Sequence, residues 1–286
     1  MAYNKRLAEA YQMPEIEKLV ENGEWTIDKF ASLLKNTAKD LDGDNKIGKD
    51  DQLGLAFDNM VGVGFPVAAG IKTSEYDSDG LPVVNMNSER TLDIISKLRV
   101  IFGDKENCFN GESVETGFDN KIFVQGRAIF NTHTMSNMIA TFREMEDDYG
   151  VLPNPKYDEN QQNYSTCVSG AGSMVVVPKT CTDPEYVGSM LEAMAAVSYD
   201  MITPDLIHTM ASTKNVRDQE SSEVVQMIIR NRNFDTARMH DINADKFVEE
   251  LLPKGSTDVA SYFAKNEKSY EKRLDEINKA YQSLDE

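Results

Sequence analysis

The stretch Asp40-Leu41-Asp42-Gly43-Asp44-Asn45-Lys46-Ile47-Gly48-Lys49-Asp50-Asp51 runs directly into the apolar segment Gln52-Leu53-Gly54-Leu55-Ala56-Phe57. Acidic side chains occupy the first, third, fifth and twelfth positions of the loop, which is the ligand plan of an EF-hand-type calcium loop. Each of Asp40, Asp42 and Asp44 would supply a carboxylate oxygen to Ca²⁺. The backbone carbonyl of Lys46 would add another oxygen, and Asp51 would close the loop. The pattern predicts a structural calcium site.

Two positions of this loop differ from the EF-hand consensus. Asn45 stands at the sixth position, where Gly is usual, and Asn is the next best residue for a turn with positive φ. Asp51 replaces the usual Glu and has a shorter reach. This variant resembles dockerin-type calcium loops more than calmodulin-type loops. A solvated acidic turn is the alternative, although clustered Asp side chains would repel one another without a cation.

The elements on either side of the loop are predicted to be a helix and a buried strand. Thr26 is a typical N-cap, with Asp28 in the first turn, where a carboxylate suits the helix dipole. Ile27, Phe30 and Leu34 then fall on one face at helical spacing. After the loop, 52–57 has the apolar character of a strand that enters a core.

Further strands and helices alternate along the chain. Buried strands are expected at 128–131, 150–153 and 174–178, and a hairpin turn at 76–80. Helices are expected at 14–21, after the N-cap Ser88, at 135–145, after Asp183-Pro184, after Thr203-Pro204 and from about 259 to 284. This interleaving predicts an α/β fold with a surplus of helix.

Composition limits the classes of partner and compartment. The chain has 286 residues, which suggests about two domains, and a net charge of −18. Nucleic acids and anionic membranes bind basic patches, so neither is an expected partner. The three cysteines, Cys108, Cys167 and Cys181, show no CxxC spacing. The sequence contains no apolar run long enough for a transmembrane helix and no signal peptide at its start.

A search for catalytic motifs finds little. The sequence has no P-loop, HExxH or GxSxG motif. Gly170-Ala171-Gly172 resembles part of a dinucleotide loop, but it precedes a predicted strand instead of joining a strand to a helix. His133, His208 and His240 are widely spaced. A glycosidase-type carboxylate pair stays open as an alternative, and the main expectation is a protein without enzymatic activity.

Several segments, in this order along the chain, resemble the extracellular solute-binding proteins (family 1, sugar-type) of ABC transporters, which include maltose-binding protein. The resemblance is strongest to large lipoprotein variants from gut Gram-positive bacteria. The segments that carry it are Tyr3-Asn4-Lys5, Gly23-Glu24-Trp25-Thr26-Ile27-Asp28, the acidic loop, Gly126-Arg127-Ala128-Ile129-Phe130, and Tyr149-Gly150-Val151-Leu152-Pro153-Asn154-Pro155-Lys156 with Val177-Pro178-Lys179.

The resemblance implies a type II periplasmic-binding-protein-like architecture, with two α/β lobes and a ligand cleft between them. Residues 1–157 plus 238–286 would form the second, C-terminal lobe, and 158–237 a partial first lobe. Tyr3-Asn4-Lys5 matches the point where the family's chain first crosses into the second lobe. The resemblance therefore implies an N-terminally truncated chain, with much of the first lobe, the signal peptide and the lipid-anchor cysteine upstream. The full-length protein would be an extracellular lipoprotein.

Sugar sites combine aromatic faces that stack on sugar rings with planar polar groups that bind hydroxyls. By analogy with the family, the segment that ends at Phe65 and the loop after 128–131 approach the cleft. The expected ligand-binding residues are Asn59, Phe65, Asn131, His133, Met135 and Tyr262. Core packing is the alternative for Phe65 and Tyr262. Trp25, the only tryptophan, lies beside a helix cap and is expected to pack in the core.

The favoured hypothesis is the substrate-binding component of an ABC importer. It would be a monomer that captures a carbohydrate or oligosaccharide and delivers it to permease subunits, with Ca²⁺ as a structural ion. The first alternative is a calcium-stabilised interaction module on the cell surface with no role in small-molecule transport. A glycan hydrolase is the third hypothesis.

Overall fold

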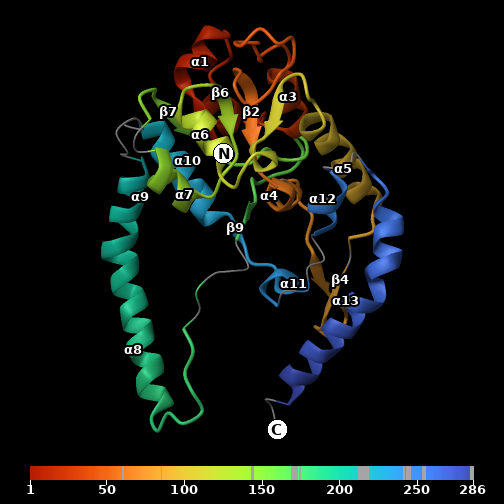
Figure 1. Cartoon of the computed structure of the whole chain (residues 1–286). Helices are drawn as coiled ribbons and strands as arrows, with labels where there is room; N and C mark the ends of the chain where they lie inside the picture. The colour runs from red at the N-terminus through yellow and green to blue at the C-terminus, as the bar shows by residue number, and fades with distance from the viewer. Residues whose placement is uncertain are drawn as a thin grey trace.

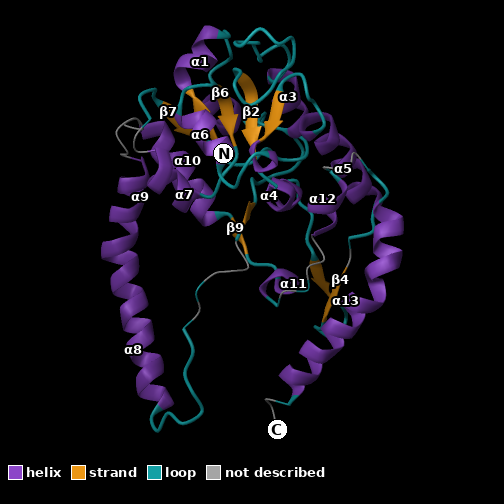
Figure 2. Cartoon of the chain, viewed as in Figure 1, coloured by secondary structure: helices purple, strands orange, loops and turns teal. Residues whose placement is uncertain are grey.

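The structure is a computed structural model that describes residues 1–59, 61–84, 86–142, 145–168, 173, 175–211, 219–240, 242, 246–252 and 256–283. The Gly170-Ala171-Gly172 motif lies outside the described residues. The fold is a helix-rich α/β arrangement around a mixed sheet, and two long helical segments extend from the sheet region (Figures 1 and 2).

The main sheet has five strands in the order β5-β2-β6-β1-β7. Strand β2 runs parallel to β5 and β6, whereas β1 runs antiparallel to β6 and β7. The two parallel strands β2 and β6 have only buried residues, which explains their continuous apolar sequences. The strand bounds are β1 Ala2–Asn4, β2 Leu53–Phe57, β5 Cys108–Asn110, β6 Ala128–Asn131 and β7 Tyr149–Val151. Strands β2 and β6 confirm two of the predicted strands, and β7 confirms the first half of the strand predicted at 150–153.

Helices cover this sheet or extend beyond it. Those associated with the sheet region are α1 Lys5–Ala10, α2 Ile16–Glu21, α3 Ile27–Leu33, α4 Val61–Ala68, α5 Glu89–Phe102, the 3₁₀-helix η1 Gly111–Ser113, α6 Phe118–Val124, α7 Met135–Thr141, α10 Gln219–Arg230 and α12 Lys246–Leu251. The remaining elements are α8 Pro184–Val197, the π-helix η3 Ser198–Ile202, α9 Thr203–Ala211, α11 Thr236–Met239, α13 Val259–Gln282, the hairpin strands β3 Ser74–Tyr76 and β4 Pro82–Val84, and the parallel pair β8 Thr166–Cys167 and β9 Arg232–Asn233.

An aromatic cluster holds α3 against the sheet. The Trp25 ring is fully buried, with its centroid 5.3 Å from that of Phe30. Phe30 meets Phe130 of β6 edge-on at 5.1 Å, a favourable aromatic geometry. The indole nitrogen of Trp25 donates to the carbonyl of Pro153 at 3.0 Å. Trp25 therefore packs in the core, as predicted, and Thr26 caps α3 by accepting from the backbone N–H of Lys29.

Two predictions for the second half of the chain are wrong. The expected buried strand at 174–178 is not a strand over its described residues 175–178, and Val176 is 79% exposed. Its apolar sequence resembles a strand, but no sheet neighbour pairs with these residues. Thr203-Pro204 does not start a separate helix, because Thr203 has helical backbone angles and continues from η3 into α9. Asp183 does cap α8, as predicted.

Two helical segments extend away from the sheet on opposite sides (Figure 1). Helix α8 has no buried residue and exposes Tyr186, Met190 and Met194. Helix α13 instead buries Tyr270, Leu274 and Ile277, and it contacts β4 of the hairpin. Among the described helices, none has both the length and the apolar character required to cross a membrane.

Candidate ligand-binding cleft

A cleft of about 570 Å³ lies at the carboxyl ends of the parallel strands β2 and β6. Asp58 follows β2 directly, and Thr132–Ser136 follow β6. The other walls come from Val151–Asn154 after β7, from Ser165–Val168 around β8, and from the end of α10 and the segment after it. In open α/β sheets, ligands bind outside the carboxyl ends of the strands, so the topology places this cleft where a ligand site is expected.

The structure brings together part of the predicted site. Phe65, His133 and Met135 line the cleft. Asn131 is fully buried at the end of β6, and its amide nitrogen lies 3.1 Å from a carboxylate oxygen of Asp119. Asn59 and Tyr262 do not line the cleft. Asn59 accepts a hydrogen bond from Asn110, and the hydroxyl of Tyr262 donates to Glu250.

Phe65 belongs to both the cleft wall and the core. Its side chain is only 1% exposed, and its ring meets Phe102 edge-on at 5.0 Å and stacks on Phe30 at 6.2 Å. The ring therefore has little freedom to reorient. The ring forms a fixed apolar part of the cleft wall, and neither of its faces is open for stacking on a ligand.

The side chain of His133 contacts helix α6 through Asn120. The side-chain nitrogen of Asn120 lies 3.1 Å from Nε2 of His133. Burial lowers the pKa of His133, and the nearby Asp119 partly opposes that shift. Burial also raises the pKa of Asp119, against the opposing effects of Asn131 and His133. A neutral imidazole at this position can accept one hydrogen bond and donate another.

Several buried oxygen atoms near His133 have no hydrogen-bond partner among the described residues. They are Oδ1 of Asp119, Oδ1 of Asn120, Oδ1 of Asn131 and Oγ1 of Thr132. Buried polar atoms in proteins are nearly always paired with protein, water or ligand groups. Of these residues, Thr132 lines the cleft, whereas Asp119, Asn120 and Asn131 do not. They form a buried polar cluster next to the cleft residue His133, which Asn120 contacts.

Two arginines complete the opposite wall. Arg232 donates from Nε to the carbonyl of Ile229 at 2.8 Å, and Arg238 donates from Nε to the carbonyl of Val168 at 3.0 Å. Sequence reasoning missed both arginines, because Arg232 reaches the cleft through the pairing of β9 with β8, and Arg238 reaches it from α11 through its hydrogen bond to Val168. It also missed Asp58, although the position of Asp58 directly after a predicted strand was a usable signal.

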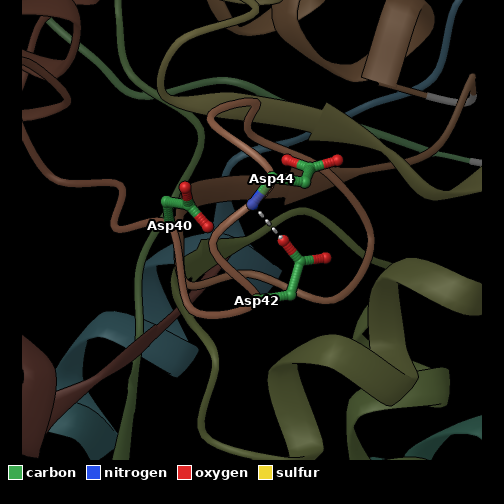
Figure 3. Close-up of side chains that lie close together, drawn as sticks. All are labelled: Asp40, Asp42 and Asp44. Atoms are coloured by element: carbon green, nitrogen blue, oxygen red, sulfur yellow. Dashed lines mark hydrogen bonds between the residues drawn. The ribbon is translucent and has the colours of Figure 1, made fainter.

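The acidic loop forms a second polar centre, and none of its residues lines the cleft. Figure 3 shows the side chains of Asp40, Asp42 and Asp44. Carboxylate oxygens of Asp40, Asp42 and Asp44 lie within 4.8 Å of one another. Asn45 has φ 63°, as the predicted turn requires. Asp51 is buried, and its two oxygens accept from the backbone N–H groups of Leu41 and Gly48. Asp51 therefore closes the loop through hydrogen bonds, and it does not belong to the close carboxylate group.

No protein-family model matches the sequence, and no curated protein matches it either. Solved structures do match. The ABC substrate-binding protein Lmo0181 from Listeria monocytogenes, in complex with cycloalternan, has a TM-score of 0.57 at 13% identity, over 98% of this chain and 69% of that chain. UgpB from Mycobacterium tuberculosis, in complex with glycerophosphocholine, has a TM-score of 0.58 at 15% identity, over 96% of this chain and 68% of that chain.

The maltose/maltodextrin-binding domain MalE from Bdellovibrio bacteriovorus, bound to maltotriose, gives a similar match. Its TM-score is 0.55 at 17% identity, over 93% of this chain and 69% of that chain. The match covers nearly all of this chain in each case, so the likeness extends beyond the sheet. This chain has the type II periplasmic-binding-protein-like fold of the ABC-transporter solute-binding proteins that resemble maltose-binding protein.

Proposed function

We propose that this protein is the substrate-binding component of an ABC importer and that it captures a carbohydrate or oligosaccharide. The proposal rests on the cleft at the carboxyl ends of β2 and β6, whose lining combines the polar side chains of Thr132 and His133 with apolar side chains. The polar side chains suit hydroxyl groups, and Met135 supplies apolar surface for a sugar ring face, while Phe65 forms part of the rigid apolar wall. The fold supports the same role, because the solved structures that it resembles include an ABC substrate-binding protein in complex with cycloalternan and a maltose/maltodextrin-binding domain.

The protein would act by binding alone and would release the same molecule that it captured. Its partner would be the permease of the importer, which it would meet outside the cell as an anchored monomer. Calorimetric titration with a panel of mono- and oligosaccharides tests binding, and chromatography of the recovered sugar tests for chemistry. Recovery of unchanged sugar is expected. A shortened product would favour the glycan hydrolase instead.

We also propose that 158–237 belongs to a lobe other than that formed by 1–157 and 238–286. Helix α8 has no buried residue and exposes Tyr186, Met190 and Met194, which supports this division. An apolar helix face of this kind normally packs against another layer. Limited proteolysis tests the division: early cuts within 175–211 should leave the sheet region folded. Loss of the near-ultraviolet circular dichroism of the buried Trp25 together with the first cut would contradict it.

The acidic loop is proposed to bind Ca²⁺ as a structural ion. The close approach of Asp40, Asp42 and Asp44 supports this, because Ca²⁺ takes several oxygen ligands and offsets the repulsion among carboxylates. In this role the ion would brace the connection between α3 and β2. A calcium-stabilised interaction module is the alternative function, and it predicts the same loop without any sugar binding in the cleft.

A further inference from the structure

A second hollow, of about 400 Å³, lies apart from the cleft and is surrounded by exposed aromatic rings. Tyr76 at the end of β3 is 64% exposed, Phe234 before α11 is 61% exposed, and Tyr281 near the end of α13 is 54% exposed. These three rings come from distant parts of the sequence and line the same hollow. Figure 1 shows the elements β4, α11 and α13 near one another on the side of the molecule opposite α8.

The scaffold under this hollow is fixed by a buried carboxylate. Asp235 accepts hydrogen bonds from the backbone N–H groups of Thr73 and Ser74 at the start of β3, at 2.7 Å and 3.2 Å. It also accepts from the backbone N–H of Arg238 and so caps α11. The hydroxyl of Ser74 in turn accepts from the backbone N–H of Ala237. The hairpin and α11 are thereby joined, and the rings they carry are preorganised.

Polar groups stand between the rings. The hydroxyl groups of Tyr76 and Thr236 are 2.6 Å apart, and the hydroxyl of Tyr281 lies 3.0 Å from Nε2 of His240. The His240 and Tyr281 rings meet edge-on, with centroids 5.5 Å apart. Asn278 adds an amide to the lining. These groups orient the aromatic rings and keep further capacity for hydrogen bonds with a ligand.

The lining contains no Lys, Arg, Asp or Glu, and none of its residues is shared with the cleft. The guanidinium carbon of Arg232, a cleft residue, lies 5.9 Å from the centroid of the Phe234 ring, but Arg232 does not line the hollow. A phosphate or carboxylate ligand would need a cation in the lining for recognition, so the chemistry favours a neutral ligand. Flat aromatic faces combined with hydroxyl, amide and imidazole groups suit a ring that is apolar on its faces and carries hydroxyls on its edge. We propose that this hollow is a second carbohydrate-binding site, which binds a neutral sugar unit independently of the cleft.

Affinity electrophoresis of the full chain tests this proposal, in native gels that contain soluble starch, galactomannan, xylan or inulin. The wild-type protein should be retarded in at least one of these gels. Phe234→Ala and Tyr281→Ala should each weaken that interaction about tenfold, because each removes one stacking surface. Phe234→Trp, which keeps a ring, should retain it. Thermal melts confirm that each variant is folded, and the exposure of both rings gives the two truncations little effect on folding.

Two controls separate this site from the rest of the molecule. Tyr199→Ala removes an aromatic side chain that is 74% exposed but lies outside the hollow, and it should leave retardation unchanged. His133→Ala alters the cleft and should also leave it unchanged, so failure of the cleft proposal is distinguishable. The proposal is overturned if no gel retards the wild type, if retardation survives both Phe234→Ala and Tyr281→Ala, or if His133→Ala abolishes it.

Discussion

The side-chain amide of Asn120 on α6 lies 3.1 Å from Nε2 of His133, the residue that enters the cleft after β6. The two residues are thirteen positions apart, and the fold joins them through the packing of α6 against β6. The preceding residue of α6, Asp119, accepts a hydrogen bond from the side-chain amide of Asn131. Helix α6 therefore positions two residues at the end of β6 without lining the cleft itself.

Replacing Asn120 should weaken ligand binding without loss of the fold. Asn120→Ala removes the partner of the His133 ring, so the imidazole gains freedom and binding should weaken about tenfold, the scale of one net hydrogen bond. Asn110→Ala is the matched control, because its amide binds Asn59 away from the cleft. Calorimetry on both variants measures the effect. Equal affinities of the two variants would contradict a positioning role for Asn120.

Folding stability should depend on the protonation of His133. Burial lowers its pKa in the folded protein below the ordinary value of 6.5, so the unfolded chain binds more protons as the pH falls below about 6.5. The contribution of His133 to the free energy of unfolding is therefore retained above that pH and decreases as the pH drops toward the folded pKa. His133→Gln should flatten this part of the profile in urea titrations. Profiles of the same slope for both proteins would show that His133 does not contribute.

Calcium should raise the thermal stability of the chain. Addition of a chelator is expected to lower the melting temperature, because the repulsion among Asp40, Asp42 and Asp44 would no longer be offset. The double variant Asp42→Ala and Asp44→Ala should lose the sensitivity to chelator, since it lacks two of the proposed ligands. Asp77→Ala with Asp79→Ala, in the hairpin turn, is a control with the same change in charge. A melt that does not respond to chelator in the wild type would refute the calcium proposal.

Trp25 should contribute strongly to the stability of the sheet region. Trp25→Phe keeps an aromatic ring but removes the hydrogen bond to Pro153 and leaves a space in the core. We expect a loss of about 1–3 kcal/mol in the free energy of unfolding, measured by urea denaturation. Tyr186→Phe, on the exposed helix α8, should change the stability by less than about 0.5 kcal/mol. Similar values for the two variants would contradict a core role for Trp25.

The sequence was sufficient for the elements whose signals are local. The N-caps Thr26, Ser88 and Asp183 all begin helices as predicted, because capping depends on the side chain and the next few backbone groups. The buried strands at 53–57 and 128–131 were also predictable from continuous apolar runs. The apolar segment 174–178 was wrongly predicted to be a strand, because local hydrophobicity does not show whether a partner strand is available for pairing.

The candidate site was only partly predictable for the same reason. His133 and Met135 follow a recognisable strand, and both line the cleft, so their proximity to it could be inferred from the sequence. Arg232 reaches it through a pairing between strands more than sixty residues apart, from Thr166 to Arg232, and Arg238 reaches it through a hydrogen bond to Val168 over a similar separation. No local signal marks such contacts. Tyr262 was expected at the cleft, but it binds Glu250 and packs against the core.

The central claim is that the cleft binds a carbohydrate, and calorimetric titration of the wild type and His133→Ala tests it most directly. The panel should include glucose, maltose, maltotriose and longer oligosaccharides. Each sugar is also titrated into Phe234→Ala, so that binding at the second hollow can be distinguished from binding in the cleft. We expect saturable binding of at least one sugar to the wild type and to Phe234→Ala, and binding about tenfold or more weaker to His133→Ala. The absence of saturable binding for every sugar, or identical affinities in the wild type and His133→Ala, would contradict it.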